Sequence, residues 1–477
     1  MKLSDQRRFR MTVAAVGLSV FVTIPLWSQT ENAPPQQPVA PLVGIDNGTP
    51  PVEGTDHDAD NNRMLVPPPV SGETYSVLPL SQERSNYLRY GVSFTGAYTD
   101  NAVGGASGHP ISDISYSVAP IVELDETTSR LEWLASYAPG FTFYQRTREL
   151  NAADHNASID FRYRLSPHVS FSAQDTFQKS SSMFNQPNYG SIGSVSGGAQ
   201  QPNFSVVAPI ADRLSNSGNV SLIYQFALNS MIGINGMFSN LNYPNPDQVP
   251  GLYDSRSQAG SAFYSRRVSK SHYLGTIYQY QRLLTSLTEG LNETQTHAVL
   301  FFYTLYPTTR FSLSFFGGPQ YSDTVQPAMP PLEPQPFESK TWTPAMGASL
   351  SWQGRLNTFA LSYFHIISGG GGLIGAVRMD NATASFRQQI SRYFSASLGG
   401  AYVQNNVIGS TSFGLYSGHT VSGTASLQRE FGQHLVMQLG YTRIHQTYNN
   451  VAVIALAPDT NREFVSFTYQ FSRPLGR

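Results

Sequence analysis

The sequence lacks cysteine and has few charged residues. Its 477 residues include no Cys, and Asp, Glu, Lys and Arg together make up 13% of the chain, about half of the ~25% that is typical of soluble proteins. The absence of Cys excludes disulfide frameworks, Cys-zinc sites, thiol catalysis and a lipid-modified N-terminal Cys. The formal net charge of −1 excludes a broadly basic nucleic-acid binder. The low share of charged residues means that part of the protein surface need not face water.

Long hydrophobic runs are absent except near the N-terminus. Four basic residues lie within the first ten positions, and the apolar stretch 11–26 follows them. This order is typical of a secretory signal peptide, with Ser28 as the residue near which cleavage is expected. The stretch is shorter than the roughly 20 residues that span a bilayer. We therefore predict an exported protein with a signal peptide at 1–28 and no transmembrane helix after it.

Residues 29–85 differ in composition from the rest of the chain. Ten of the 31 prolines fall here, mixed with Gln, Asn, Asp and Gly. Such a segment buries too little apolar surface to offset the entropy lost on ordering, so we predict a disordered periplasmic tether that is able to reach a periplasmic partner. Asp56, Asp58 and Asp60 imitate the start of a calcium-binding loop, but Asn61 replaces the glycine that this loop requires. We expect no metal site.

Apolar and polar residues alternate with a period of two from residue 90 onward. Eighteen candidate strands follow one another between 90–99 and 462–471, and no amphipathic helical segment interrupts them. Short turns and longer loops alternate between these strands. Strands of about ten residues joined in this way are typical of a transmembrane antiparallel up-and-down β-barrel with short periplasmic turns and long external loops. We predict such an all-β barrel of 16–18 strands over 86–477.

The last strand has an aromatic face. Val465, Phe467, Tyr469 and Phe471 alternate with polar residues. This segment resembles the closing strand of porin-like β-barrels of bacterial outer membranes, although six residues follow Phe471 here. The resemblance implies location in the cell outer membrane, contact with outer-membrane lipid, and a closing strand that is recognised by the barrel-assembly machinery. It implies no particular substrate.

Motifs for catalysis, metal binding or cofactor binding are missing. The sequence has no H-E-x-x-H, no P-loop, and no serine in the nucleophile position of a G-x-S-x-G motif. His297 and His365 are the residues that a barrel-embedded hydrolase would use. A lone His on a strand is far more often a lumen or interface residue. We therefore expect no enzyme and no cofactor.

Four charged residues are candidates for lining a pore. In 155–165, Asp160, Arg162 and Arg164 lie on the face opposite the apolar residues, and Arg387 lies on the corresponding face of 375–390. Charged side chains in a pore set ion preference. The alternative is that these arginines only solvate the lumen and pair with acids such as Asp160, Glu123 or Asp175.

The connection 179–216 is the longest of the predicted external loops and the third in order. It is rich in Gly, Ser, Asn and Gln and has few charges, and loops of this length are usually functional or disordered. In general porins, to which this topology is similar, the third loop folds inward and narrows the channel. The weak charge of this loop favours an uncharged hydrated solute.

These features leave three functions open. The first is a monomeric or homo-oligomeric channel for passive diffusion of small hydrophilic solutes. The second is a barrel for polysaccharide export that works with periplasmic partners through 29–85. The third is a structural or adhesive barrel that presents its external loops.

Overall fold

The computed structural model describes residues 86–475 except for short gaps. These gaps are 104–109, 183, 185–194, 197–198, 201–204, 208–209, 288–289, 309, 329–334, 410–416, 450 and 452–458. The predicted signal peptide with its cleavage site near Ser28 and the predicted tether 29–85 lie outside the described residues.

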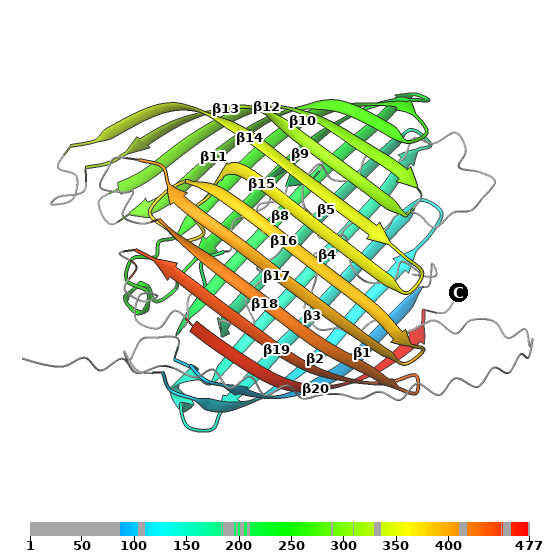
Figure 1. Ribbon diagram of the computed structural model, residues 1–477, viewed down its shortest axis with the longest axis vertical. Helices are drawn as coiled ribbons and strands as arrows, with labels where there is room; N and C mark the ends of the chain where they lie inside the picture. Colours follow the sequence, from blue (N-terminus) through cyan, green and yellow to red (C-terminus); the bar gives the residue numbers. More distant parts are fainter. Residues whose placement is uncertain are drawn as a thin grey trace, which may run out of the picture. The chain divides into compact units, whose positions relative to one another are not determined.

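The described chain forms an eighteen-stranded antiparallel sheet that closes on itself as a barrel (Figure 1). A second pair, β6 (Val195–Ser196) and β7 (Ala199–Gln200), lies between β5 and β8. The 3-10 helices that the structure describes in full are η1 (Arg148–Leu150) and η3 (Pro246–Gln248). The barrel strands are β1 (Tyr87–Thr99), β2 (Asp113–Thr127), β3 (Leu131–Tyr144), β4 (Ala152–Ser166), β5 (Val169–Ser182), β8 (Ile210–Ala227), β9 (Ser230–Asn242), β10 (Ser255–Ser269), β11 (His272–Leu287), β12 (Gly290–Thr308), β13 (Phe311–Gln326), β14 (Phe337–Gln353), β15 (Asn357–Ser368), β16 (Val377–Ser391), β17 (Phe394–Val407), β18 (Gly418–Phe431), β19 (Leu435–Tyr448) and β20 (Asp459–Pro474).

Pairing between the first and last strands closes the barrel. β1 pairs with β20 in one uninterrupted register, from Tyr87 opposite Pro474 to Thr99 opposite Arg462. Every other barrel strand pairs with its neighbours in sequence. The prediction of an all-β, up-and-down barrel of eighteen strands is confirmed, and with it the resemblance to porin-like barrels at the level of architecture.

Connections of two or three residues join the strands at one end of the barrel, which we call the turn end, and longer connections join them at the other, which we call the loop end. The exception is β11 and β12, which two residues join at the loop end. Both strands at the seam, β1 and β20, have their free ends at the turn end. The connection between β5 and β8 is shorter than predicted, because β5 extends to Ser182 and β8 already begins at Ile210. We name four long connections by their order: loop 3 (183–209), loop 4 (243–254), loop 7 (369–376) and loop 9 (449–458).

Side chains alternate between the two faces of the barrel wall. On β20, Val465, Phe467 and Tyr469 are exposed on the outside, whereas Ser466 and Thr468 between them are buried on the inside. The same alternation follows from strand pleating around the whole barrel. Among the described residues, no helix has the length and apolar character needed to cross a membrane.

Inward-facing glycines let aromatic rings lie flat on the inner wall. A Cβ added at Gly275 of β11 would meet the ring of Phe302 on β12 and the carbonyl oxygen of Tyr264 on β10. The ring of Phe316 covers Gly347 in the same way. Because glycine has no side chain, each ring gains contact with the backbone of the adjacent strand.

We predict that G275V destabilises the barrel by about 1–3 kcal/mol, because the new side chain overpacks the site beneath Phe302. The measurement is the temperature at which the detergent-solubilised protein loses its folded mobility on an unboiled gel. G399V is the matched control, since a Cβ at the inward-facing Gly399 of β17 would meet nothing within 4 Å. Equal transition temperatures for the two variants would contradict the prediction.

Candidate functional site

One sector of the inner wall is lined by paired hydroxyl groups. These pairs join adjacent strands between β20 and β4. In each pair, hydroxyl groups on neighbouring strands form a hydrogen bond with each other along the inner face. They are Ser93–Ser466 at 3.1 Å, Ser93–Thr468 at 3.0 Å, Ser117–Thr142 at 2.9 Å and Ser136–Ser158 at 2.7 Å. We call this the hydroxyl sector. Its surface is short, polar and able to hydrogen-bond water.

The opposite sector of the inner wall also carries hydroxyl pairs, such as Thr304–Ser314 at 2.9 Å and Ser362–Thr383 at 2.6 Å, but it differs in its large apolar side chains. Inward-facing side chains of β9 to β16 join one buried cluster, which we call the apolar sector. Its largest members are Met231, Phe263, Tyr273, Ile277, Leu300, Phe302, Phe316 and Phe364. A buried cluster on the inner face is unlike the polar, water-facing interior that the period-two pattern predicts for a channel.

Loops complete the apolar sector. Val206 of loop 3, Val249 of loop 4, Leu373 of loop 7 and Val451 of loop 9 belong to the same cluster, and each is fully buried. These side chains leave the strands at the loop end and return into the barrel because burial of apolar surface stabilises them there. These four loop residues therefore cover part of the apolar sector.

Loops 4 and 7 are hydrogen-bonded to each other. The backbone N–H of Tyr253 donates to the carbonyl oxygen of Gly372 at 2.7 Å. Gly372 has a φ of 105°, and a Cβ there would lie 2.6 Å from the hydroxyl oxygen of Tyr243, so only glycine fits. Burial raises the pKa of the Tyr243 phenol. The phenol therefore stays neutral inside this contact.

Loop 3 is fixed to the far wall of the barrel. The N–H of Val207 donates to Oε1 of Gln446 on β19 at 3.2 Å, and Nε2 of Gln446 donates to the carbonyl oxygen of Val207 at 2.7 Å. Asn405 on β17 donates to the hydroxyl of Ser205 at 2.7 Å, and Thr420 on β18 donates to the Ser205 carbonyl oxygen at 2.9 Å. We call these contacts of Ser205–Val207 the latch.

The first part of loop 3 reaches the same wall. The guanidinium of Arg462 on β20 lies 4.9 Å from the centre of the Phe184 ring. Loop 3 thus leaves β5, contacts β20, and is latched to β17, β18 and β19 before it enters β8. These contacts bring Phe184 and Ser205–Val207 to the inner wall of β17 to β20. Constriction of the channel by the connection 179–216 stays a prediction.

The predicted pore-lining residues of β4 face the interior. Ile159 and Leu165 are exposed on the outside, so Asp160, Arg162 and Arg164 point inward. Nη1 of Arg162 lies 3.3 Å from a carboxylate oxygen of Glu132 on β3. All three residues lie toward the turn end of β4. Their role in ion preference stays a prediction.

Arg387 faces the interior on another part of the wall. It shares the inward face of β16 with buried Thr383 and interacts with the charge of Glu430 on β18. The structure therefore does not bring Arg387 together with the residues of β4. At each place an inward arginine instead lies near an acidic residue of another strand. Arg162 lies near Glu132 on β3, and Arg387 lies near Glu430 on β18.

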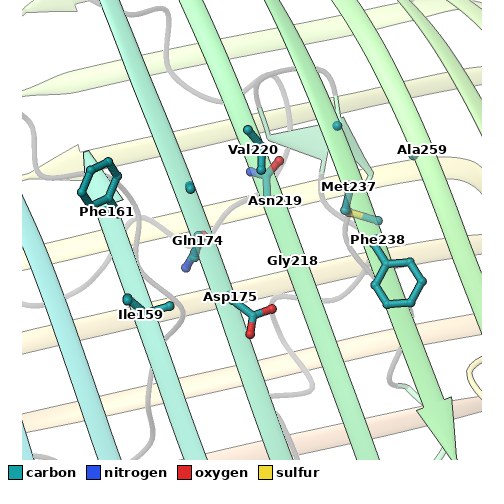
Figure 2. Close-up of a pocket in the computed structure, with 12 residues that line it drawn as sticks. Ile159, Phe161, Gln174, Asp175, Gly218, Asn219, Val220, Met237, Phe238 and Ala259 are labelled. Carbon is teal, nitrogen blue, oxygen red and sulfur yellow. The ribbon is translucent and has the colours of Figure 1, made fainter. Parts of the chain in front are cut away.

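Asp175 does not line the lumen, and its expected pairing with the lumen arginines is wrong. It lies on the same face of β5 as Phe177, which is exposed on the outside, and Nδ2 of Asn216 lies 3.2 Å from its carboxylate oxygens. Figure 2 shows Asp175 in an outer groove of about 650 Å³ that Gly218 and Phe238 also line. Asp175 and Phe177 are two positions apart on β5, so strand alternation puts them on the same face.

Three inward arginines were missed because they lie at or beyond the predicted strand ends. Arg89 pairs with Glu123 at 2.7 Å, one residue before the strand expected at 90–99. Arg213 was counted in the loop 179–216, yet it is fully buried on β8 and donates to the Val206 carbonyl oxygen at 3.2 Å. Arg462 is the first residue of the strand expected at 462–471. The alternation of side chains between the two faces continues beyond each expected strand end. Extending it to these positions would have placed the three arginines on the inward face.

The aromatic face of the closing strand lies on the outside. Val465, Phe467, Tyr469 and Phe471 are exposed, and the Phe471 ring stacks on Tyr90 of β1 with 5.3 Å between ring centres. The outer aromatic face of β20 therefore continues across the seam onto β1. Recognition of these residues by the assembly machinery stays a prediction.

The two candidate histidines also lie on the outside. Nδ1 of His297 is 2.9 Å from the hydroxyl of Tyr278, and Nδ1 of His365 is 2.7 Å from a carboxylate oxygen of Asp380. Both side chains are thus on the face opposite the latch. Among the residues that the structure describes, no group of three or more His, Asp or Glu is arranged to hold a metal ion.

Comparisons with known proteins found similar solved structures. No family model matches the sequence, and no curated protein matches it. OccAB4 of Acinetobacter baumannii is 11% identical over 82% of this chain and 99% of its own, with a TM-score of 0.38. OpdK of Pseudomonas aeruginosa, solved with vanillate, is 8% identical over 81% and 99%, with a TM-score of 0.38. The unliganded ferric citrate transporter FecA is 9% identical over 79% and 63%, with a TM-score of 0.39.

We predict that Q446L releases the latch, because it removes both hydrogen bonds to Val207 and leaves two buried backbone groups without a partner, at a cost of about 1–3 kcal/mol each. The measurement is hydrogen exchange of peptides that contain Val207 in the folded, detergent-solubilised protein. Exchange should become several-fold faster than in the wild type.

The control for this prediction is Q438L. Gln438 lies on the same inward face of β19, and its Oε1 has no hydrogen-bond partner. Exchange at Val207 in Q438L should equal that of the wild type. Unchanged exchange in Q446L would show that the latch does not hold loop 3.

Proposed function

We propose that the protein is a porin-like channel of the bacterial outer membrane through which small hydrophilic solutes diffuse passively. The observation that carries this proposal is a closed barrel with an apolar outer face, paired hydroxyl groups on its inner face, and Ser205–Val207 of loop 3 bound to the inner wall. A closed barrel leaves no unpaired strand edge in lipid.

The outer face supports a position within a bilayer. Large apolar and aromatic side chains are exposed on every part of the wall, among them Phe94 on β1, Ile234 on β9 and Phe301 on β12. In water such a surface would favour aggregation. In an outer membrane it is the face that contacts lipid, so exposure of these side chains is favourable.

The interior supports a path along the hydroxyl sector. Paired Ser and Thr side chains present a thin polar wall, whereas the apolar sector is filled by loops 3, 4, 7 and 9. Charged pairs such as Arg89 with Glu123 and Arg162 with Glu132 line the turn end of the same sector. A hydrated solute would therefore pass beside loop 3 and then between these charges. This path needs no cofactor.

Conductance in planar bilayers tests the channel. We expect stable single-channel steps from the purified mature protein and similar steps from a variant without residues 29–85, because the barrel strands begin at Tyr87. Silence of the mature protein with large openings of the truncated one would instead support partner-gated export. Silence of both would contradict the channel and favour an adhesive barrel.

The charges on β4 provide a second test. We predict that R162Q/R164Q shifts the chloride-to-potassium permeability ratio toward potassium by about two-fold, since removing lumen cations changes the field in the pore. The reversal potential in a KCl gradient measures this ratio. R429Q is the matched control, because Arg429 is an arginine near the turn end of β18 that stacks on the outer side chain Phe431. An equal shift in both variants would contradict pore lining by β4.

A further inference from the structure

Four successive connections at the turn end each carry one cation and no acid. They join β10 to β11, β12 to β13, β14 to β15 and β16 to β17. The four cations are Lys270, Arg310, Arg355 and Arg392, and all of them are exposed. No Asp or Glu occurs within ten residues of any of them in the sequence. We call these four residues the basic rim.

The charge of the basic rim is not compensated by the barrel. Within the described part of the chain, none of its four side chains forms an ion pair. Arg392 lies over the ring of its neighbour Tyr393, with 5.5 Å between the guanidinium carbon and the ring centre. Glu430 of β18, an acid at the same end of the barrel, interacts with the inward side chain of Arg387. The rim therefore attracts anionic groups that lie beyond the turn end.

Cations at the loop end of the same strands are paired instead. Arg282 of β11 lies 2.8 Å from a carboxylate oxygen of Glu293 on β12, and Lys340 of β14 lies 2.5 Å from one of Glu338. Acids thus accompany the cations at one end of these strands and are missing at the other. The acids that would balance the basic rim must come from outside the barrel.

The N-terminal region of the chain is attached to the turn end. The carbonyl oxygen of Asn86 accepts a hydrogen bond from the N–H of Leu475 at 2.8 Å, and its side-chain oxygen accepts one from the N–H of Thr127 at 2.7 Å. Tyr87 then begins β1. These contacts fix the point at which the preceding residues leave the barrel, on the same end as the basic rim.

The N-terminal region is acidic. Residues 29–85, which lie outside the described residues, contain eight acidic and two basic side chains. Four of the acids, Glu53, Asp56, Asp58 and Asp60, fall within eight positions that hold no Lys or Arg. We call 53–60 the acidic segment. Its charge is opposite to that of the basic rim.

The acidic segment is close enough in the chain to reach the rim. The 26 residues 61–86 separate it from β1, and a chain of this length spans up to about 85 Å when extended. Eighteen strands about 4.8 Å apart and tilted by about 40° close a barrel roughly 35 Å wide. Every position of the basic rim is therefore within reach.

We propose that the acidic segment 53–60 docks on the basic rim, so that this part of the N-terminal region lies against the turns of the barrel. A segment of the same chain is present at high local concentration. Ion pairs between exposed groups are individually weak and are screened by salt, so the docking is reversible. The proposal does not depend on the channel function, and it gives Asp56, Asp58 and Asp60 a role other than calcium binding.

Carbodiimide cross-linking tests the docking, because this reagent joins a carboxylate to a lysine amine only where the two groups meet. Lys270 is one of four lysines in the sequence, and residues 29–85 contain none. In the full mature protein, held as single copies in nanodiscs of phosphatidylethanolamine and phosphatidylglycerol, we expect amide bonds between Lys270 and the acidic segment. Mass spectrometry identifies them. Their yield should fall several-fold in about 0.5 M NaCl, since salt screens exposed charges.

A triple variant tests the remaining cations of the rim. R310Q/R355Q/R392Q keeps Lys270 but removes three of the four attracting charges, so the yield at Lys270 should fall about five-fold or more. The matched control R256Q/R378Q/R443Q removes three exposed arginines of the loop end and should leave the yield unchanged.

Three results would overturn the proposal. The first is no cross-link at Lys270 while the pair Lys340 and Glu338 at the loop end is joined, which shows that the reagent is active. The second is an equal yield in the wild type and the rim variant. The third is a cross-link at Lys270 in detergent but not in nanodiscs, since phospholipid phosphates would then occupy the rim.

Discussion

Closure of the sheet is the constraint on which the rest of the structure depends. Within a bilayer each backbone N–H and carbonyl group needs a partner in the protein, and the continuous register between β1 and β20 supplies the last set of partners. Closure also fixes which side chains face inward, because the period of two leaves no freedom once one strand is placed. The final pair of the seam, Thr99 opposite Arg462, sets the position of the arginine that contacts loop 3.

Two kinds of inner wall follow from how the interior is filled. Short hydroxyl side chains satisfy one another across β20 and β1 to β4, so this sector needs no covering layer. On β9 to β16 large apolar side chains share the inward face with hydroxyl pairs, and exposure of the apolar ones to water would be costly. Loops 3, 4, 7 and 9 cover them. Burial of the apolar sector thus explains why Val206, Val249, Leu373 and Val451 of these loops pack inside the barrel wall.

The strands were predictable from the sequence because pleating imposes a local period, and each of the eighteen expected ranges overlaps one observed barrel strand. The destinations of the loops were not predictable in this way, because the contact between Val207 and Gln446 joins residues 239 positions apart. The apolar sector did have a signal. Residues 298–303 are apolar without interruption, and a strand that is apolar on both faces must be covered on both.

The path of loop 3 is set by its contacts with the inner wall. Contacts at Phe184 and at Ser205–Val207 attach the loop to the wall of β17 to β20 near both of its ends. A loop held at two points loses much of the conformational freedom of a chain of its length, so each of these two sets of contacts lowers the entropic cost of forming the other.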